Sequence, residues 1–180
     1  MRCHLCVAAA SAFILCTGAH SHAGEALRWG AIKLGIRAKF PQVAEISTEE
    51  LAGWLADKRR TPPLLLDVRE REEFAVSHLK NARHITPDAD VRRLELPAQK
   101  SVPVVTYCSV GYRSAALALR LQQAGYTNVR NLEGSIFQWA NEGRPMVNER
   151  GARVTQAHPY DASWGKLLDP ERRAPVAQAR

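Results

Sequence analysis

The chain has 180 residues, which is room for one domain of ordinary size plus extensions. Hydrophobic residues make up 46% and charged residues 24%, a composition that excludes a disordered, collagen-like or membrane-embedded body. The net charge of +7 leaves two kinds of partner open, nucleic acid or small anions. The four cysteines allow a disulfide framework or a metal site on count alone, and they are Cys3, Cys6, Cys16 and Cys108.

Residues 1–23 have the features of a secretory signal peptide. Arg2 is the only charged residue before Glu25, and the apolar run 5–16 is shorter than the ~20 residues that a helix needs to cross a bilayer. Small residues at the end of the segment predict cleavage after Ala23, with Ala19 as the alternative site. We therefore expect a periplasmic or secreted protein with no stable membrane span after cleavage. A helix that stays attached as an anchor is the alternative.

Cleavage would change the cysteine inventory. Three of the four cysteines would leave with the signal, while the net charge would fall only to +6. Cys3 and Cys6 have the spacing of metal ligands, but no second Cys or His pair follows them, so we expect no metal site. The remaining thiol, Cys108, cannot form an internal disulfide. In an oxidising compartment such a lone cysteine is a candidate reactive residue.

A helical extension is predicted over residues 24–42. Leu27, Ala31 and Leu34 have a loosely helical spacing, which predicts that they pack on the flank of the domain. At the other end of the chain, the tail 148–180 is polar and rich in proline. There we expect Tyr160 and Trp164 to hold the tail against the domain.

Between these extensions, residues 43–147 alternate between strand and helix patterns. Ser47 and Glu50 form a capping-box pattern at the start of a helix, whose last turn is predicted to carry the basic residues 58–60. The alternation predicts an α/β fold with a central parallel sheet flanked by helices on both faces. The predicted strands are 64–68, 82–85, 102–107 and 129–132. The predicted helical segments after the capping-box helix are 69–79, 90–96, 114–124 and 135–141.

Cys108 comes directly after the predicted buried strand 102–107, where an open α/β sheet places its ligands. A strand-to-helix turn gathers backbone N–H groups, and the helix start adds partial positive charge. Gly111 permits a backbone conformation that other residues resist, and Arg113 adds a permanent cation. Together these features favour thiolate over thiol and would bind an anionic substrate against the sulfur. An inert buried cysteine is the structural alternative.

The segment CSVGYRS, residues 108–114, resembles the active-site loop of the rhodanese-like sulfurtransferases, whose cysteine carries a persulfide. Similar stretches in the family's order cover 43–147 and imply one rhodanese-like domain. Three residues depart from the family pattern: Ser77 and Asn81 stand where glycine is usual, and Glu133 replaces a glycine. We expect these departures to affect local turns more than chemistry. The other matching stretches are LLDVREREEF (65–74), SHLKNA (77–82) and LEG (132–134) followed by Trp139.

The resemblance implies roles for particular residues. Cys108 is the expected nucleophile, and Arg113 is expected to hold the charged end of the sulfur donor. Arg69 either does the same or forms a salt bridge with Glu72 or Glu73. Asp67 is expected to support the loop backbone, and His78 to be structural. The backbone amides expected to bind substrate are those of Ser109, Val110, Gly111, Tyr112, Arg113 and Ser114.

Loop length separates sulfur from phosphate chemistry among proteins that resemble this fold family. The loop from Cys108 to Arg113 has six residues, whereas phosphatase and arsenate reductase loops place the arginine one position later, at Ser114 here. The resemblance thus implies transfer of a sulfane sulfur from thiosulfate or a similar anion to cyanide, a small thiol or a protein thiol, without a cofactor. A non-catalytic sulfur-carrier or binding module is the first alternative, and an enzyme of the phosphatase or arsenate reductase type is the second. We expect no nucleic-acid partner, because the basic residues lack interleaved aromatics.

Overall fold

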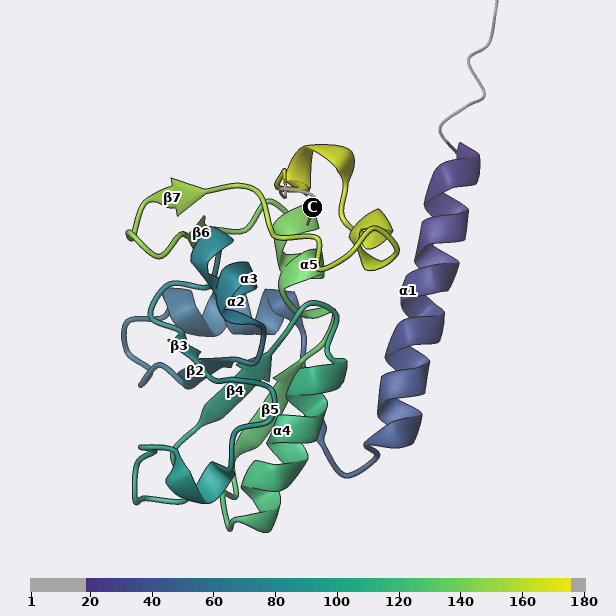
Figure 1. Ribbon diagram of the computed structural model, residues 1–180. Helices are drawn as coiled ribbons and strands as arrows, with labels where there is room; N and C mark the ends of the chain where they lie inside the picture. The colour runs from purple at the N-terminus through teal and green to yellow at the C-terminus, as the bar shows by residue number, and fades with distance from the viewer. Residues whose placement is uncertain (1–18, 176–180) are drawn as a thin grey trace, which may run out of the picture.

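The computed structural model describes residues 19–175, with side chains from Gly24 onward. Cys3, Cys6, Cys16 and most of the predicted signal peptide lie outside the described residues. In the described part, a parallel sheet has the strand order β1-β5-β4-β2-β3 (Figure 1). The α/β class with a central parallel sheet is thereby confirmed. The strands are β1 (Ala44–Ile46), β2 (Leu64–Asp67), β3 (Arg83–His84), β4 (Val104–Tyr107) and β5 (Val129–Leu132).

Helices pack against both faces of the sheet because successive strand residues point to opposite sides. Leu65 packs in a cluster with α2 (Thr48–Ala56) and α5 (Ser135–Asn141), whereas Leu66 packs in a second cluster with α4 (Tyr112–Gln123). A shorter helix, α3 (Arg71–Val76), follows β2.

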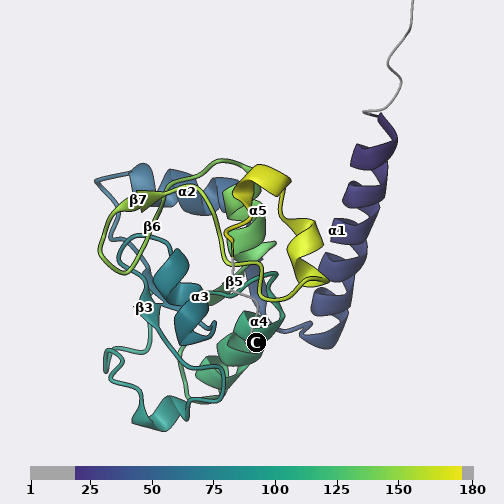
Figure 2. The ribbon, with the colours of Figure 1, turned by 45° about the horizontal axis from the view of Figure 1, so that its top comes forward.

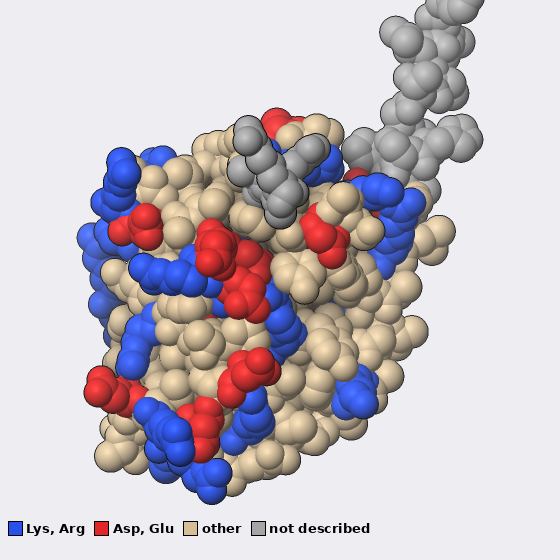
Figure 3. Space-filling model, in the orientation of Figure 1, with Lys and Arg blue, Asp and Glu red and all other residues tan. Residues whose placement is uncertain are grey.

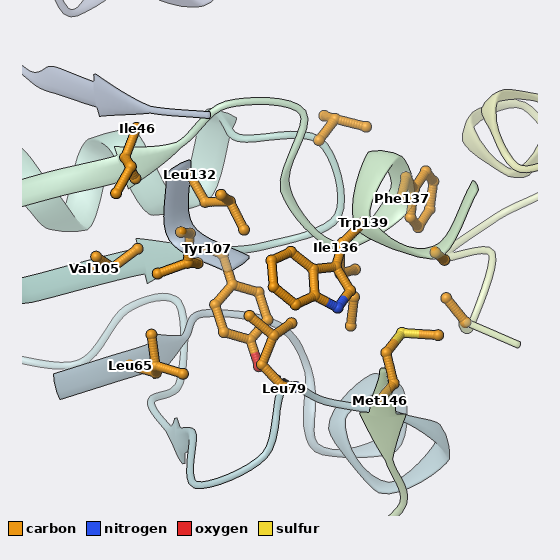
Figure 4. Packing of buried hydrophobic residues seen from close by; sticks show 14 of the residues in the cluster. Ile46, Leu65, Leu79, Val105, Tyr107, Leu132, Ile136, Phe137, Trp139 and Met146 are labelled. Atoms are coloured by element: carbon orange, nitrogen blue, oxygen red, sulfur yellow. Dashed lines mark hydrogen bonds between the residues drawn. The ribbon is translucent and has the colours of Figure 1, made fainter. Parts of the chain in front are cut away.

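Tyr107 lies in the centre of the first cluster, among the residues drawn in Figure 4. Its hydroxyl accepts a hydrogen bond of 3.0 Å from the Leu79 backbone N–H. Burial raises the pKa of Tyr107 well above its ordinary value, so the phenol stays neutral. The last residue of β4 is thus fixed by packing and by a hydrogen bond, which determines where the following residue, Cys108, lies.

The predicted capping box is confirmed, but the predicted end of its helix is wrong. The Ser47 hydroxyl accepts from the Glu50 N–H at 3.1 Å, and the Glu50 carboxylate accepts from the Ser47 N–H at 2.9 Å. However, α2 ends at Ala56, and Asp57 is its C-cap. The basic residues 58–60 follow the helix rather than forming its last turn, since Asp57 adopts an extended backbone there.

The N-terminal helix α1 (Ala19–Lys39) forms, but it packs through a face other than the predicted one. Leu27 and Leu34 are 75% and 67% exposed. Trp29, Ile32 and Ile36 face the domain instead. The helix runs through both predicted cleavage sites, and cleavage stays a prediction. Within residues 19–175, every helix is too short or too polar to cross a membrane.

The C-terminal tail folds back over the domain beside α5 and reaches toward α1 (Figure 2). It is held by the buried residues Ala157, Leu167 and Leu168 more than by the predicted aromatics. Tyr160 and Trp164 are 47% and 40% exposed, so burial of these two side chains contributes less to holding the tail than predicted. Strand β6 (Met146–Val147) pairs with β7 (Arg153–Val154) of the tail, which also contains the 3₁₀ turns η2 (Trp164–Leu167) and η3 (Pro170–Arg172).

Charged side chains are mixed on the face shown in Figure 3, where Lys and Arg are scattered among Asp and Glu. The part of this face nearest α1 is mostly neither acidic nor basic (Figure 3).

Candidate active site around Cys108

Cys108 follows the carboxyl end of β4, and its residue surface is only 1% exposed. Helix α4 begins at Tyr112, two residues earlier than predicted, so the turn between strand and helix is short. Gly111 is the N-cap of α4, with a φ of 116° in the region that favours glycine. A Cβ at Gly111 would lie 3.3 Å from the Ile36 Cδ1 atom, so glycine also permits the close approach of α1.

The sulfur of Cys108 accepts a hydrogen bond from a backbone amide. The Gly111 N–H lies 3.2 Å from Sγ, and no side chain caps the N-terminus of α4. The first amides of this 12-residue helix are therefore available to a ligand beside the thiol, where the helix dipole favours negative charge. This geometry suits a thiolate or an anionic sulfur compound.

Helix α5 holds the backbone of the cysteine loop from the opposite side. The Ser135 hydroxyl accepts from the Cys108 N–H at 3.1 Å. The Ile136 and Phe137 amides donate to the carbonyl oxygens of Cys108 and Ser109, each at 3.1 Å. Loop carbonyls are thereby turned toward α5. Ser135 was not among the predicted site residues, although it directly follows the LEG motif.

Arg113 forms an ion pair with Glu73 of α3. Its two terminal nitrogens lie 2.9 and 3.1 Å from the carboxylate oxygens, and one of them also donates to the Ser109 hydroxyl at 2.9 Å. The Ser109 hydroxyl in turn donates to Glu73 at 2.9 Å. Arg113 is thus beside the thiol as predicted, but its charge is shared with a carboxylate. Glu73 is a site residue that the sequence analysis did not assign.

The ionisation of this pair is set by competing effects. Burial disfavours the Glu73 carboxylate, but hydrogen bonds and charge from Arg113 outweigh burial and lower the pKa of Glu73. Burial likewise disfavours the Arg113 cation, but Glu73 and the Cys108 sulfur outweigh it and raise the pKa of Arg113. Both groups are therefore charged at neutral pH, and the cation is held next to the sulfur.

Arg69 has an environment that differs from both of its predicted roles, holding the donor or pairing with Glu72 or Glu73. Its side chain is fully buried and forms a salt bridge of 2.7 Å with Asp67, not with Glu72 or Glu73. The Asp67 carboxylate also accepts from the Arg69 backbone N–H at 3.1 Å. Asp67 therefore stabilises the turn after β2. Arg69 links this turn to Ser77 by donating a hydrogen bond of 2.5 Å to the Ser77 carbonyl oxygen.

The other residues singled out from the sequence lie in different environments. The side chain of Ser114 is fully buried and donates to Asn131 at 2.7 Å, so only its backbone amide remains a candidate for ligand binding. His78 is stacked on Phe74 with ring centroids 3.8 Å apart, and its Nδ1 lies 2.9 Å from the Phe74 carbonyl oxygen. Asn81, one of the three departures from the family pattern, has a φ of 65°, a conformation that asparagine tolerates in place of glycine.

A pocket of about 690 Å³ opens over Cys108. Its walls come from three separate parts of the chain, namely the cysteine loop, α1 and the C-terminal tail. Among residues 19–175, no cluster of three or more His, Cys, Asp or Glu side chains is arranged to hold a metal ion. The residues on the walls include Ile32 and Ile36 of α1, Val110 and Tyr112 of the loop, and Tyr160 and Trp164 of the tail.

The parallel sheet and the cysteine in its strand-to-helix loop define a cysteine-loop α/β domain. A family model described as a rhodanese-like domain matches residues 47–142, and the chain belongs to this family. A protein of Allochromatium vinosum named a sulfurtransferase is 37% identical over 113 residues, which cover 61% of this chain and 99% of that protein. A thiosulfate sulfurtransferase GlpE of Actinobacillus succinogenes is 31% identical over 90 residues, covering 50% and 80% of the two chains.

Among solved structures, a rhodanese-like domain protein from Staphylococcus aureus has a TM-score of 0.52 and 29% identity. The aligned region covers 59% of this chain and 99% of the Staphylococcus aureus chain. In two other curated relatives the match covers a smaller share of the relative, 58% of one and 27% of the other. Helix α1 and the tail from residue 148 lie outside the family match.

Proposed function

We propose that this protein transfers a sulfane sulfur from thiosulfate or a similar anion to cyanide or a thiol through a persulfide on Cys108. The family and the relatives named sulfurtransferases support sulfur transfer in general. The observation that carries the specific proposal is the hydrogen bond of 3.2 Å from the Gly111 N–H to the Cys108 sulfur, at the uncapped start of α4. This arrangement favours sulfur in its anionic form, which is the nucleophile.

In the first step, the Cys108 thiolate attacks the outer sulfur of thiosulfate. A bond forms between Sγ and that sulfur, the sulfur–sulfur bond of thiosulfate breaks, and sulfite leaves with the electron pair. The amides at the start of α4 and the Arg113 cation stabilise the negative charge that collects on the sulfurs. This step requires no oxidant, reductant, metal or organic cofactor.

In the second step, cyanide or a thiolate attacks the outer sulfur of the persulfide. The bond from Sγ to the outer sulfur breaks, and its electron pair returns to Cys108 as thiolate. Cyanide leaves as thiocyanate, and a thiol leaves as a persulfide. Cys108 thus alternates between a thiolate and a persulfide, and the same amides serve both.

A thiosulfate:cyanide assay on the full chain tests this proposal, with Cys108→Ser as the variant and Cys16→Ser, in the predicted signal peptide, as the control. We expect thiocyanate formation by the wild type and the control, and its loss in Cys108→Ser. Equal activity in all three proteins would overturn the proposal. A gain of one sulfur on Cys108 without turnover would instead identify a sulfur carrier.

We also propose that the chain is exported and cleaved after Ala23 or Ala19. The proposal rests on the basic start, the short apolar run and the small residues of the N-terminal segment. Fractionation of expressing cells followed by N-terminal sequencing is the test. We expect the exported form to begin at Gly24 or His20, and an uncleaved chain confined to the cytoplasm would contradict the proposal.

A further inference from the structure

The pocket over Cys108 is built largely by segments that lie outside the family match. Ile32 and Ile36 come from α1, and Tyr160 and Trp164 come from the tail. The thiol lies at its floor. A pocket of about 690 Å³ falls in the range of ~300–1,000 Å³ that suits drug-sized ligands, and it is far larger than thiosulfate or cyanide requires.

Helix α1 is held over the loop by a residue that departs from the family pattern. Glu133 forms a salt bridge of 2.7 Å with Lys33 and a second ion pair with Arg37. Arg37 also pairs with Glu45 at 2.7 Å. Burial opposes the charge of Glu133, but the two cations outweigh burial and lower its pKa. The glutamate at this position therefore connects the cysteine loop region to an element that the matched family domain does not include.

The tail positions its two aromatic side chains through defined local structure. Tyr160 has a φ of 65°, which is rare for a bulky residue, and its N–H donates to His158 Nδ1 at 3.0 Å. Its ring lies 4.9 Å from the guanidinium carbon of Arg113. The Asp161 carboxylate accepts from the Ser163 and Trp164 amides, each at 2.8 Å. Backbone strain of this kind persists only where the surrounding structure holds the residue in place.

The lining of the pocket is mostly apolar. Lys39 and Arg113 are its charged residues, and Arg113 is already paired with Glu73. Covering an apolar wall with an apolar ligand removes it from water and so favours binding, whereas the same wall does not stabilise a small anion. Because Cys108 is only 1% exposed at the floor, a small molecule can reach the sulfur more readily than a thiol on a folded partner.

Building on the proposed sulfur transfer, we propose that α1 and the tail form a binding site for a small-molecule thiol with a bulky apolar body, which serves as sulfur acceptor. The acceptor thiolate attacks the outer sulfur of the Cys108 persulfide. The bond from Sγ to that sulfur breaks, its electron pair returns to Cys108, and the proton on the outer sulfur leaves with the product persulfide. The step needs no other reactant. The apolar body of the acceptor thiol lies between α1 and the ring of Trp164.

The test uses Cys108 loaded with one sulfur from thiosulfate, in the full chain. The rate of sulfur loss is measured by mass spectrometry with phenylpropanethiol and with mercaptoethanol, two alkyl thiols of which one carries an apolar body. We expect the wild type to favour phenylpropanethiol about tenfold, as burial of part of an aromatic ring predicts. Ala31→Glu, at an exposed pocket position, and Trp164→Ala are each expected to bring this ratio to within about twofold of one.

Ala38→Glu is the matched control, because Ala38 is exposed on the same helix and does not line the pocket. It should keep the tenfold ratio. If the persulfide forms and cyanide removes it, but the ratio is near one in the wild type, the acceptor proposal is wrong and the proposed function stands. A cysteine-containing protein that reacts faster than phenylpropanethiol would also overturn it. If no persulfide forms on Cys108, the proposed function itself fails.

Discussion

Arg113 and Glu73 are 40 residues apart in sequence and form an ion pair with two contacts, at 2.9 and 3.1 Å, beside the Cys108 thiol. The Glu73 side chain is only 2% exposed and that of Arg113 is 22% exposed. The pair therefore joins α3 to the start of α4 in a site largely shielded from solvent, and it fixes the Arg113 cation next to the sulfur.

We predict that Glu73→Gln lowers both stability and sulfur loading. The amide can keep one hydrogen bond to Arg113 but cannot neutralise it, so unfolding free energy should fall by about 2–3 kcal/mol. Release of Arg113 from its position should slow persulfide formation by about tenfold. Urea unfolding and the rate of loading from thiosulfate measure the two effects.

Glu72→Gln is the control for this change, because Glu72 is the exposed neighbour of Glu73 on α3. Its effect on unfolding should stay within about 0.5 kcal/mol. Equal effects of the two variants would mean that the ion pair with Arg113 does not determine the loading rate.

A second prediction concerns the buried pair of Asp67 and Arg69, both with fully buried side chains. Burial disfavours the Arg69 cation, but Asp67 outweighs it and raises the pKa of Arg69. Arg69→Met should lower the free energy of unfolding by about 3–5 kcal/mol, because the Asp67 carboxylate is left buried without its cationic partner. The double variant with Asp67→Asn should recover part of that loss, as a double-mutant cycle in urea would measure.

Arg71→Met is a matched control, since the side chain of Arg71 is 62% exposed. We expect it to change stability by less than about 0.5 kcal/mol. A full loss of loading with unchanged stability in Arg69→Met would contradict the structural role and restore the substrate-binding one.

The cysteine loop could be predicted from sequence because its information is local. Cys108, Gly111 and Arg113 lie within six residues, and the strand pattern before them and the helix pattern after them are strong. The same holds for β5 and α5, which have their predicted bounds. In each case the hydrophobic period and one turn residue determine the element.

The parts that sequence could not predict depend on contacts between distant residues. Nothing near Glu73 indicates that it, rather than Arg69, meets the loop, since the pairing with Arg113 exists only in the fold. For α1, the spacing of Leu27 and Leu34 suggested a packing face, but ion pairs from Glu133 turn the helix so that Ile32 and Ile36 face the domain. Glu133 was visible only as a departure from a family pattern.

We predict that Glu133→Gly, which restores the residue usual in the family, loosens α1 without unfolding the domain. Each ion pair contributes roughly 0.5–1 kcal/mol, so loss of both should raise local opening of α1 about five- to thirtyfold. Hydrogen exchange should increase over residues 29–39 and stay unchanged in α4. Glu133→Gln, which removes the charge and keeps the size, should give most of the same increase. Unchanged exchange in both variants would show that the apolar face alone holds α1.

The last prediction is that the tail loosens in mild acid through His158. Burial lowers the pKa of His158 below its ordinary value of about 6.5, with Glu73 opposing this effect. A base whose pKa is lowered in the folded state binds protons more readily when the tail is detached. Its contribution to stability is therefore complete above about pH 6.5 and is lost as the pH falls through that value toward the folded pKa.

Protonation of His158 also removes a hydrogen-bond acceptor, because its Nδ1 receives the Tyr160 N–H at 3.0 Å. We expect the protection factors of residues 157–168 in hydrogen exchange to be lower at about pH 5.5 than at about pH 7.5, after correction for intrinsic exchange rates. The variant His158→Asn keeps a neutral acceptor and should show no such difference. Equal pH dependence in the wild type and His158→Asn would assign the effect to another group. Since Tyr160 and Trp164 line the pocket over Cys108, the same acidification should reduce the preference for phenylpropanethiol over mercaptoethanol.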